Sequence, residues 1–447
     1  MTSSQDGFRR RVAGVFATRV AQFVIGFANS FLLARLLGPA GRGAFYLVTL
    51  TPTVLASVGQ FGLPSALSFF SGRGRSAAAL LRTALLVGIG LAAALAAGTL
   101  LVLPWLEATV LRAAPADLLR LALISLPFQF VAGFIGSVLI GRQVMRNYNL
   151  ILIGQTVIAL LLTIVLVAWL GLGVFGAVLA NILVAASGAA AVAIEGRRLL
   201  RTEGGRGPGI RGGELLGYGM RLYPASVTSF LSYRLDVYLL GWLLGDAVQI
   251  GLYSMAVSLA ELTFFVPDSV ATVFFPRVAG ADRLNADEMT PMVCRFTVLV
   301  TLLVSLALIP AAFVAVNVIL PAFVACMPAF LVILPGVVAL SVSKILSSYV
   351  SGLGLPAPVA LASSVALVIN VVANILLIPT AGIVGSAAAS LISYTVHAVM
   401  LVTISSGLAG KPASAFVIPG GAEWTRLVTG LRQIAALLRR APAGEAS

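Results

Sequence analysis

Seven ionisable side chains lie within long apolar stretches of the 447-residue sequence, where a charge is costly to keep. A charge at the centre of a membrane-spanning helix costs roughly 2.5–3.5 kcal/mol, so such side chains face a water-filled cavity or one another. Two of them, Arg221 and Asp268, lie near the ends of their stretches and could instead reach the aqueous interface. The full set is Arg19, Arg221, Arg234, Asp236, Glu261, Asp268 and Lys344.

Three of these stretches carry cations that suit an anionic substrate. In the first stretch, Arg19, Gln22 and Asn29 recur at helical spacing, which puts them on one face of a helix. We expect this face to line a cavity, and a contact between helices is the alternative. Arg234 and Lys344 add cations from two later stretches. Because Arg holds phosphate through paired hydrogen bonds and Lys acts as a point charge, these five residues are the predicted substrate-binding set for a group such as a diphosphate.

The acidic side chains of Asp236 and Glu261 suit a coupling ion, either H⁺ or Na⁺. Arg234 is only two residues from Asp236, so the two side chains leave a helix in different directions and do not pair. Mutual neutralisation of the acids and bases, with no role in transport, is the alternative for all of these charges. The sequence has no catalytic constellation, and Cys294 and Cys326 have no metal-ligand spacing. We therefore expect neither an enzyme nor a metal or organic cofactor.

Composition indicates which elements position these side chains. The sequence is 60% hydrophobic with a mean hydropathy of +1.06, and 10% of its residues are charged. An ordinary soluble domain has about 25% charged residues, and about 20 apolar residues cross a membrane as a helix. We therefore predict an all-α integral membrane protein with about 12 transmembrane helices. The expected spans are 12–33, 44–66, 77–104, 120–140, 150–170, 174–194, 217–242, 252–275, 292–315, 329–350, 359–378 and 383–405.

Positive charge is distributed unevenly between the loops on the two sides of these spans. Of the 29 Lys and Arg residues, 21 fall on the side that holds both ends of the sequence. The opposite loops hold Arg35, Arg42, Arg112 and Arg120. Because positive residues accumulate on the cytoplasmic side, we expect a multi-pass protein of the bacterial inner membrane with both termini in the cytoplasm. The net charge of +14 is then a topology signal and does not indicate nucleic-acid binding.

Three glycine landmarks recur at an offset of 207–209 residues, which indicates an internal repeat. An offset that covers six spans makes the repeats parallel, with a substrate path between them that suits alternating access. We therefore predict two parallel six-helix bundles. The landmark pairs are Gly38 with Gly245, Gly43 with Gly251, and Gly173 with Gly382.

The domain boundaries follow from this repeat. Residues 1–195 form the expected N-terminal bundle and residues 217–405 the C-terminal bundle. The Gly- and Arg-rich segment 196–216 between them is typical of a flexible cytoplasmic linker. The remaining residues, 406–447, form a cytoplasmic tail in which 423–440 has the pattern of an amphipathic helix. Such a helix would lie on the anionic leaflet, and docking to a partner protein is the alternative.

Four groups of segments, spread over nearly the whole sequence, carry a family resemblance. In their order and spacing they resemble the polysaccharide flippase family of the multidrug/oligosaccharidyl-lipid/polysaccharide exporter superfamily. The groups are Phe31–Pro39 with Gly43 and Phe61–Pro64; Leu235–Gly241 with Gly251–Tyr253 and Phe275–Pro276; Pro335–Val338 with Lys344 and Ser351–Gly352; and Asn370 and Asn374 with Ile378–Pro379, Gly382–Gly385 and Tyr394.

The resemblance implies a V-shaped pair of bundles that moves a polyprenyl-diphosphate-linked oligosaccharide from the cytoplasmic to the outer leaflet through a cationic cavity. It implies phosphate or sugar contacts for Arg19 and Lys344, and ion coupling for Asp236 and Asn374. The sequence departs from the family at 353–356, Leu-Gly-Leu-Pro, which lacks the basic residue often found there. Twelve expected spans, against fourteen in the lipid II branch, argue against export of a peptidoglycan precursor.

We therefore expect an ion-coupled flippase or exporter for a lipid-linked oligosaccharide. The expected partners are the lipid-linked glycan, membrane lipid, a polysaccharide polymerase and glycosyltransferases, and not nucleic acid. A multidrug or metabolite cation antiporter of the same superfamily is the alternative within transport, although an acid-dominated cavity would be expected there. A non-transporting scaffold of a polysaccharide synthesis complex is the alternative from another class.

Overall fold

The structure is a computed structural model that describes residues 2–203, 208–421, 423 and 425. The side chains of residues 2–20, 145, 203, 222, 225, 226 and 229 lie outside this description. Every element in the described ranges is a helix and none is a strand, which confirms the all-α class. Nine helices in these ranges are long and apolar enough to cross a membrane, so the chain is a multi-pass membrane protein.

The chain folds into two compact units, which are described separately. Unit 1 comprises Met1–Ala256, Ala315–Met327 and Asn374–Ser386, and unit 2 comprises the other three segments. Those segments are Val257–Val314, Pro328–Ala373 and Ala387–Ser447. The expected domain boundaries stay a prediction, and the expected amphipathic helix at 423–440 lies outside the described residues except at 423 and 425.

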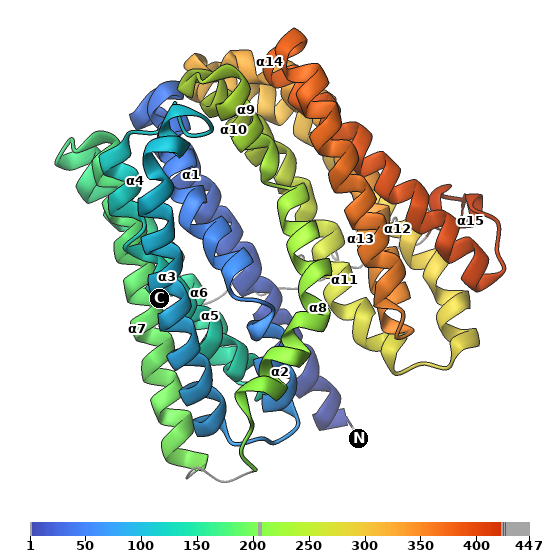
Figure 1. Cartoon of the computed structure of the whole chain (residues 1–447). Coiled ribbons are helices and arrows are strands. Elements are labelled where there is room, and N and C mark those ends of the chain that lie inside the picture. The colour runs from blue at the N-terminus through green and yellow to red at the C-terminus, as the bar shows by residue number, and fades with distance from the viewer. Residues whose placement is uncertain (1, 204–207, 422, 424, 426–447) are drawn as a thin grey trace, which may run out of the picture. The chain divides into compact units, whose positions relative to one another are not determined.

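Unit 1 is built mainly from the first nine α-helices (Figure 1). In this unit α5 packs against α2, α3 and α7, and α1 packs against α6 and α7. Phe130 and Phe134 of α5 are buried at the centre of this core. The elements are α1 (Thr2–Gly59), α2 (Leu63–Gly72), α3 (Ala77–Ala108), α4 (Ala116–Ala122), α5 (Ser125–Gly141), α6 (Met145–Leu162), the π-helix η1 (Thr163–Trp169), α7 (Gly173–Glu203), α8 (Gly212–Ser232), α9 (Leu235–Leu244), most of α10 (Ala247–Glu261), η3 (Ala315–Ile319) and η4 (Pro321–Cys326).

Unit 2 surrounds a second core, formed by α11 to α14. Tyr349 and Phe416 are fully buried among its aliphatic side chains. The short helix α15 packs against α12. The elements are the 3₁₀-helix η2 (Leu262–Phe264), α11 (Phe265–Ala279), α12 (Arg283–Val314), α13 (Met327–Gly352), both ends of α14 (Pro356–Ala409) and α15 (Ser414–Val417).

Two of the nine membrane-crossing helices each contain two of the expected spans. α1 holds the first span and most of the second, joined across Gly38, and α14 holds the eleventh and twelfth, joined across Gly382. Gly38 has a φ angle of 66° and Gly382 one of 55°, a region that glycine enters without steric cost. The backbone therefore kinks where short loops were expected. The number of spans stays a prediction.

The expected span 217–242 is not one helix, and here the prediction was wrong. The chain breaks between Ser232 and Leu235, so that α8 ends and α9 begins within the span. Just past the break, the side chain of Asp236 accepts a hydrogen bond from the amide of Val237. Such local bonds from Asp to the backbone compete with helix formation. The polar residues of the span thus interrupt it.

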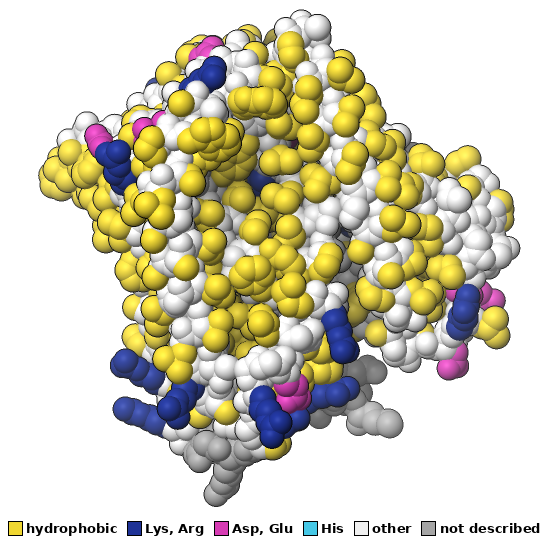
Figure 2. Space-filling view, viewed as in Figure 1, with side chains coloured by type: hydrophobic (Ala, Val, Ile, Leu, Met, Phe, Trp, Pro, Cys, Tyr) yellow, Lys and Arg dark blue, Asp and Glu magenta, His cyan; other side chains and the backbone are white. Residues whose placement is uncertain are grey.

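Apolar and basic side chains separate on the surface of unit 1. Figure 2 shows hydrophobic side chains along its helices and Lys and Arg side chains at the end where α3 begins and α7 ends. Basic residues are favoured beside the cytoplasmic ends of membrane helices, and the side of the membrane that this end faces stays a prediction. The exposed arginines of these segments include Arg73, Arg197, Arg198, Arg201 and Arg211.

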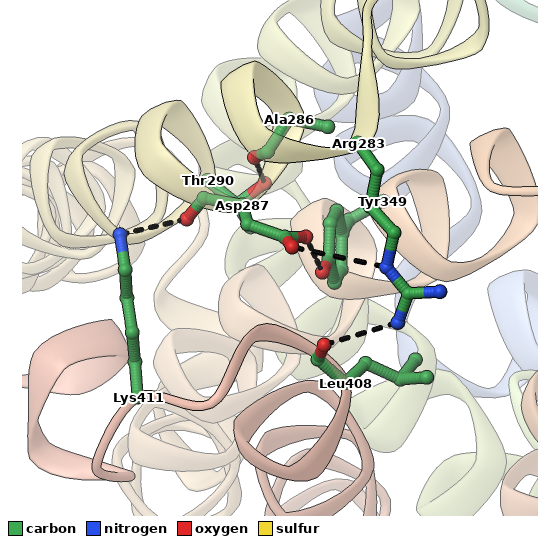
Figure 3. Close-up of polar contacts among 7 residues, drawn as sticks. All are labelled: Arg283, Ala286, Asp287, Thr290, Tyr349, Leu408 and Lys411. Atoms are coloured by element: carbon green, nitrogen blue, oxygen red, sulfur yellow. Dashed lines mark hydrogen bonds and ion pairs between the residues drawn. The ribbon is translucent and has the colours of Figure 1, made fainter.

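A polar clamp in unit 2 is centred on Asp287 of α12 (Figure 3). The hydroxyl of Tyr349 donates to its carboxylate, and the Nε atom of Arg283 lies 3.9 Å from the other carboxylate oxygen. Lys411 donates to the carbonyl oxygen of Asp287 at 2.9 Å, and Arg283 donates to that of Leu408 at 3.2 Å. The clamp therefore ties the start of α12 to α13 and to the end of α14.

Candidate functional site

The break between α8 and α9 places Asp236 deep inside unit 1. Asp236 is only 2% exposed. Its Oδ1 atom accepts the amide of Val237 at 2.8 Å, and its Oδ2 atom accepts the hydroxyl of Tyr253, a fully buried residue of α10. A buried charge is very costly unless it is hydrogen-bonded. These two donors are therefore what allows a carboxylate at this depth.

Arg234, at the same break, reaches a different helix. Its Nη1 atom donates to the hydroxyl of Tyr46 on α1 at 2.7 Å, and the side chain is half-buried. One turn further along α9, the hydroxyl of Tyr238 donates to Thr51, also on α1, at 3.3 Å. The two contacts join α9 to the second part of α1.

Arg42 is a buried cation that the sequence placed in an outer loop, and that placement was wrong. The side chain is 6% exposed, because α1 continues as a helix after its kink and carries Arg42 inward. Its Nε atom donates to Ser254 at 3.0 Å, and its other two nitrogens donate to the carbonyl oxygen and hydroxyl of Ser30 at 2.9 and 3.2 Å. Arg42 thereby links α10 to both parts of α1.

The polar side chains that these contacts involve on α1, α10 and the break between α8 and α9 are here called the unit 1 polar cluster, defined as Arg42, Tyr46, Arg234, Asp236 and Tyr253. Tyr46 follows Arg42 by one helical turn, and Tyr253 directly precedes the Ser254 that Arg42 contacts. The cluster holds two guanidinium groups and one carboxylate among helices that cross a membrane. Guanidinium groups match phosphate oxygens in geometry and charge.

Lys344 forms the corresponding cationic site in unit 2. Its Nζ atom lies 2.5 Å from Oδ1 of Asp268 and 4.0 Å from the centre of the Phe264 ring. The Lys344 side chain is 18% exposed and that of Asp268 is 58% exposed. An exposed ion pair contributes about 0–1 kcal/mol. This pair was not predicted from the sequence, because 76 residues separate its members and helical spacing does not indicate a partner on another helix.

The remaining predicted site residues are divided between the units. Asn374 is fully buried in the part of α14 that belongs to unit 1, where its Oδ1 atom accepts the hydroxyl of Ser386 at 2.8 Å. Gln22 and Asn29 are half-buried on α1. Glu261, the last residue of α10, is half-buried in unit 2. The roles predicted for all of them stay predictions.

The side chain of Arg19 lies outside the described residues. Three of the placed site residues fall in the two groups described above: Arg234 and Asp236 belong to the unit 1 polar cluster, and Lys344 pairs with Asp268 in unit 2. Arg42 is the cationic residue that sequence reasoning missed. The signal available was its position directly before the landmark Gly43, two residues ahead of the expected second span.

Over nearly its whole length the chain has a fold similar to those of solved multi-pass membrane transporters. The lipid II flippase MurJ, in an inward closed conformation, is similar with a TM-score of 0.73 and 14% identity over 96% of this chain and 93% of that chain. An inward-facing multidrug resistance MATE family transporter of the MOP superfamily has a TM-score of 0.68 and 15% identity over 94% and 96% of the two chains. The eukaryotic MATE transporter AtDTX14 has a TM-score of 0.61 and 17% identity over 92% and 99%.

The sequence comparison is more specific than the fold. The family model described as polysaccharide biosynthesis protein matches residues 11–281, which is more than half of the chain. The chain therefore belongs to the polysaccharide biosynthesis protein family. Among curated proteins, none matches the chain at a significant level.

Proposed function

We propose that the chain is a flippase that translocates a polyprenyl-diphosphate-linked oligosaccharide across the bacterial inner membrane by alternating access. The match to the polysaccharide biosynthesis family over more than half of the chain carries this proposal. The flippase fold over nearly the whole chain supports it, because MurJ is described as a lipid II flippase. Both termini then lie in the cytoplasm, and glycosyltransferases and a polysaccharide polymerase are the partners.

The cationic side chains supply the chemistry that a diphosphate needs. Arg42 and Arg234 place two guanidinium groups in the unit 1 polar cluster, and Lys344 adds an ammonium in unit 2. A guanidinium binds phosphate oxygens through parallel N–H donors, and an ammonium binds them as a compact charge. Translocation breaks no covalent bond. It consists of binding, reorientation and release of the lipid-linked substrate.

Ion coupling is proposed for Asp236, Glu261 and Asn374, with H⁺ or Na⁺ as the ion. Asp236 is the strongest of the three, because a carboxylate held by two donors can exchange one of them for a proton or a cation. Protonation would remove a negative charge from the unit 1 polar cluster. The balance of charge beside Arg42 and Arg234 would then change with each transport cycle.

The similarity to MATE transporters favours cation antiport as the second candidate. A cation substrate would be held by carboxylates, whereas the unit 1 polar cluster contributes two guanidinium groups and one carboxylate. A scaffold without transport is the third candidate.

Deletion of the gene distinguishes the three candidate functions. The readout is the leaflet in which the lipid-linked glycan accumulates. A flippase deletion leaves finished lipid-linked glycan in the cytoplasmic leaflet. An antiporter deletion leaves glycan distribution unchanged and alters cation or drug tolerance, and a scaffold deletion reduces synthesis without accumulation. Complementation with Arg234→Ala should fail, whereas complementation with Arg35→Ala, at an exposed position of α1, should succeed. Unchanged glycan distribution in the deletion strain would remove the proposed function.

A further inference from the structure

We propose that Asp268 sets the ligand selectivity of the Lys344 site by competing with the substrate phosphate for the Lys344 ammonium. This inference rests on the proposed function, since it assumes that an anionic lipid binds at Lys344. It assigns to Asp268 a role that neither the helical spacing nor the family resemblance indicates.

The geometry places the two anions in competition for one ammonium. One side of the ammonium is covered by the Phe264 ring at 4.0 Å and another by the Asp268 carboxylate at 2.5 Å. Phe264 and Asp268 are one helical turn apart, so a single segment, from η2 into α11, supplies both contacts. A phosphate oxygen that reaches the ammonium at hydrogen-bond distance shares its three donors with the carboxylate and is repelled by the carboxylate charge, so the two anions compete.

Of the two members of the pair, Asp268 is the one that can leave. Its side chain is 58% exposed, so the surrounding protein does not enclose the carboxylate and leaves it room to move away when the pair opens. Lys344 is 18% exposed, and the aromatic ring holds its ammonium by a cation–π contact. The Lys344 ammonium therefore stays in place. The Asp268 carboxylate competes with the ligand for it while remaining attached to the protein, and is here called a tethered competitor.

A tethered competitor with one negative charge selects for ligands that carry more charge. Membrane phospholipids such as phosphatidylglycerol have a phosphodiester with one negative charge and are present in great excess. A diphosphate diester carries two negative charges, so its attraction to the ammonium is stronger. Selectivity is a difference of affinities, and it is raised by an element that disfavours the wrong ligand. Asp268 is that element, and the ligand class it admits is a lipid-linked diphosphate.

The test compares binding of two lipids to the purified full chain in nanodiscs of zwitterionic lipid. A fluorescent polyprenyl diphosphate is the probe, and phosphatidylglycerol is the competitor. The variants are Asp268→Asn, Lys344→Gln and the double variant. Asp282→Asn is the control, because this carboxylate is exposed in the turn before α12. Thermal unfolding of each variant establishes that the protein is folded.

We expect Asp268→Asn to bind phosphatidylglycerol about tenfold more tightly and the diphosphate with a smaller gain, so that the selectivity ratio falls. Asp282→Asn should leave the ratio at its wild-type value. If Asp268 acts through Lys344, Lys344→Gln should weaken binding of the diphosphate, and adding Asp268→Asn to it should change nothing further.

Two results would overturn the inference, and they are distinguishable. If the wild-type chain binds the diphosphate and Asp268→Asn keeps the wild-type ratio, the selectivity role is wrong and the proposed function stands. If the wild-type chain binds no polyprenyl diphosphate, the proposed function fails and the inference fails with it. If Asp268→Asn folds poorly, Asp268→Ser takes its place in the same comparison, since a neutral hydroxyl can still accept a hydrogen bond from the Lys344 ammonium.

Discussion

Gly43 of α1 and Gly251 of α10 lie backbone against backbone, although 208 residues separate them in the sequence. A Cβ atom on Gly43 would lie 1.9 Å from the carbonyl oxygen of Ala247, and one on Gly251 would lie 1.9 Å from that of Pro39. The two contacts are reciprocal, as they are when equivalent segments of a repeat meet across a two-fold axis. Small residues allow membrane helices to approach this closely.

A methyl group at either position should separate the two helices. Overpacking of a tight contact costs about 1–3 kcal/mol, so Gly43→Ala and Gly251→Ala should each lower the midpoint temperature of thermal unfolding in detergent. Gly98→Ala is the matched control, because a Cβ at Gly98 of α3 meets open space. A midpoint for Gly43→Ala equal to that of Gly98→Ala would contradict the close approach.

The landmark glycines show what the sequence could predict. Gly38 and its counterpart Gly245 have φ angles of 66° and 64°, and Gly173 and Gly382 both have 55°. Glycine recurs at these positions in the sequence, and the backbone there has the φ angles that strongly favour glycine over other residues. The helical class and the separation of apolar and basic segments could also be predicted, because each depends on residues near one another in the sequence.

Contacts between distant segments could not be predicted in this way. Arg42 bonds to Ser254 across 212 positions, and Lys344 pairs with Asp268 across 76. Helical spacing indicates the face on which a side chain lies, but the partner depends on how the helices pack. The same limit applies to the break at Arg234, where polar contacts to α1 and α10 override the tendency of a long apolar stretch to form one helix.

The three hydrogen bonds of Arg42 predict that lysine cannot replace it. An ammonium on a flexible stem lacks the planar set of donors that reaches Ser30 and Ser254 together. Hydrogen bonds to charged groups contribute about 1.5–3 kcal/mol, so Arg42→Lys should lower the unfolding temperature. Arg35→Lys, at an exposed position of the same helix, should not. Equal melting curves for the two variants would argue against the Arg42 network.

Removing the Tyr253 hydroxyl should show how far the buried Asp236 carboxylate depends on it. Tyr253→Phe deletes the hydroxyl that bonds to the buried carboxylate, which leaves a charged acceptor short of a partner at a cost of about 1–3 kcal/mol. Asp236→Asn removes the charge itself. We expect Asp236→Asn to restore part of the stability that Tyr253→Phe loses when the two are combined. Additive unfolding temperatures in this double-mutant cycle would show that the two side chains do not interact.

The Asp287 clamp should affect stability without affecting transport. Asp287→Asn weakens the bonds to Tyr349 and Arg283 that hold the start of α12, so the unfolding temperature should fall. Transport per folded molecule should stay at the wild-type rate, because the clamp lies outside the proposed binding residues. Glu288→Gln, at the exposed neighbouring position, is the control. A large loss of transport in a fully folded Asp287→Asn protein would assign the clamp a different role.

The central claim is that this chain moves a lipid-linked diphosphate glycan between leaflets, and reconstituted vesicles test it most directly. The measurement follows a fluorescently labelled polyprenyl-diphosphate-linked oligosaccharide, using an impermeant reagent that quenches only the label in the outer leaflet. Vesicles with the wild-type chain should expose nearly all of the label, whereas vesicles with Arg234→Ala, or without protein, should keep about half of it protected. Protection of half the label in the presence of folded wild-type protein, under both a proton and a sodium gradient, would contradict the account.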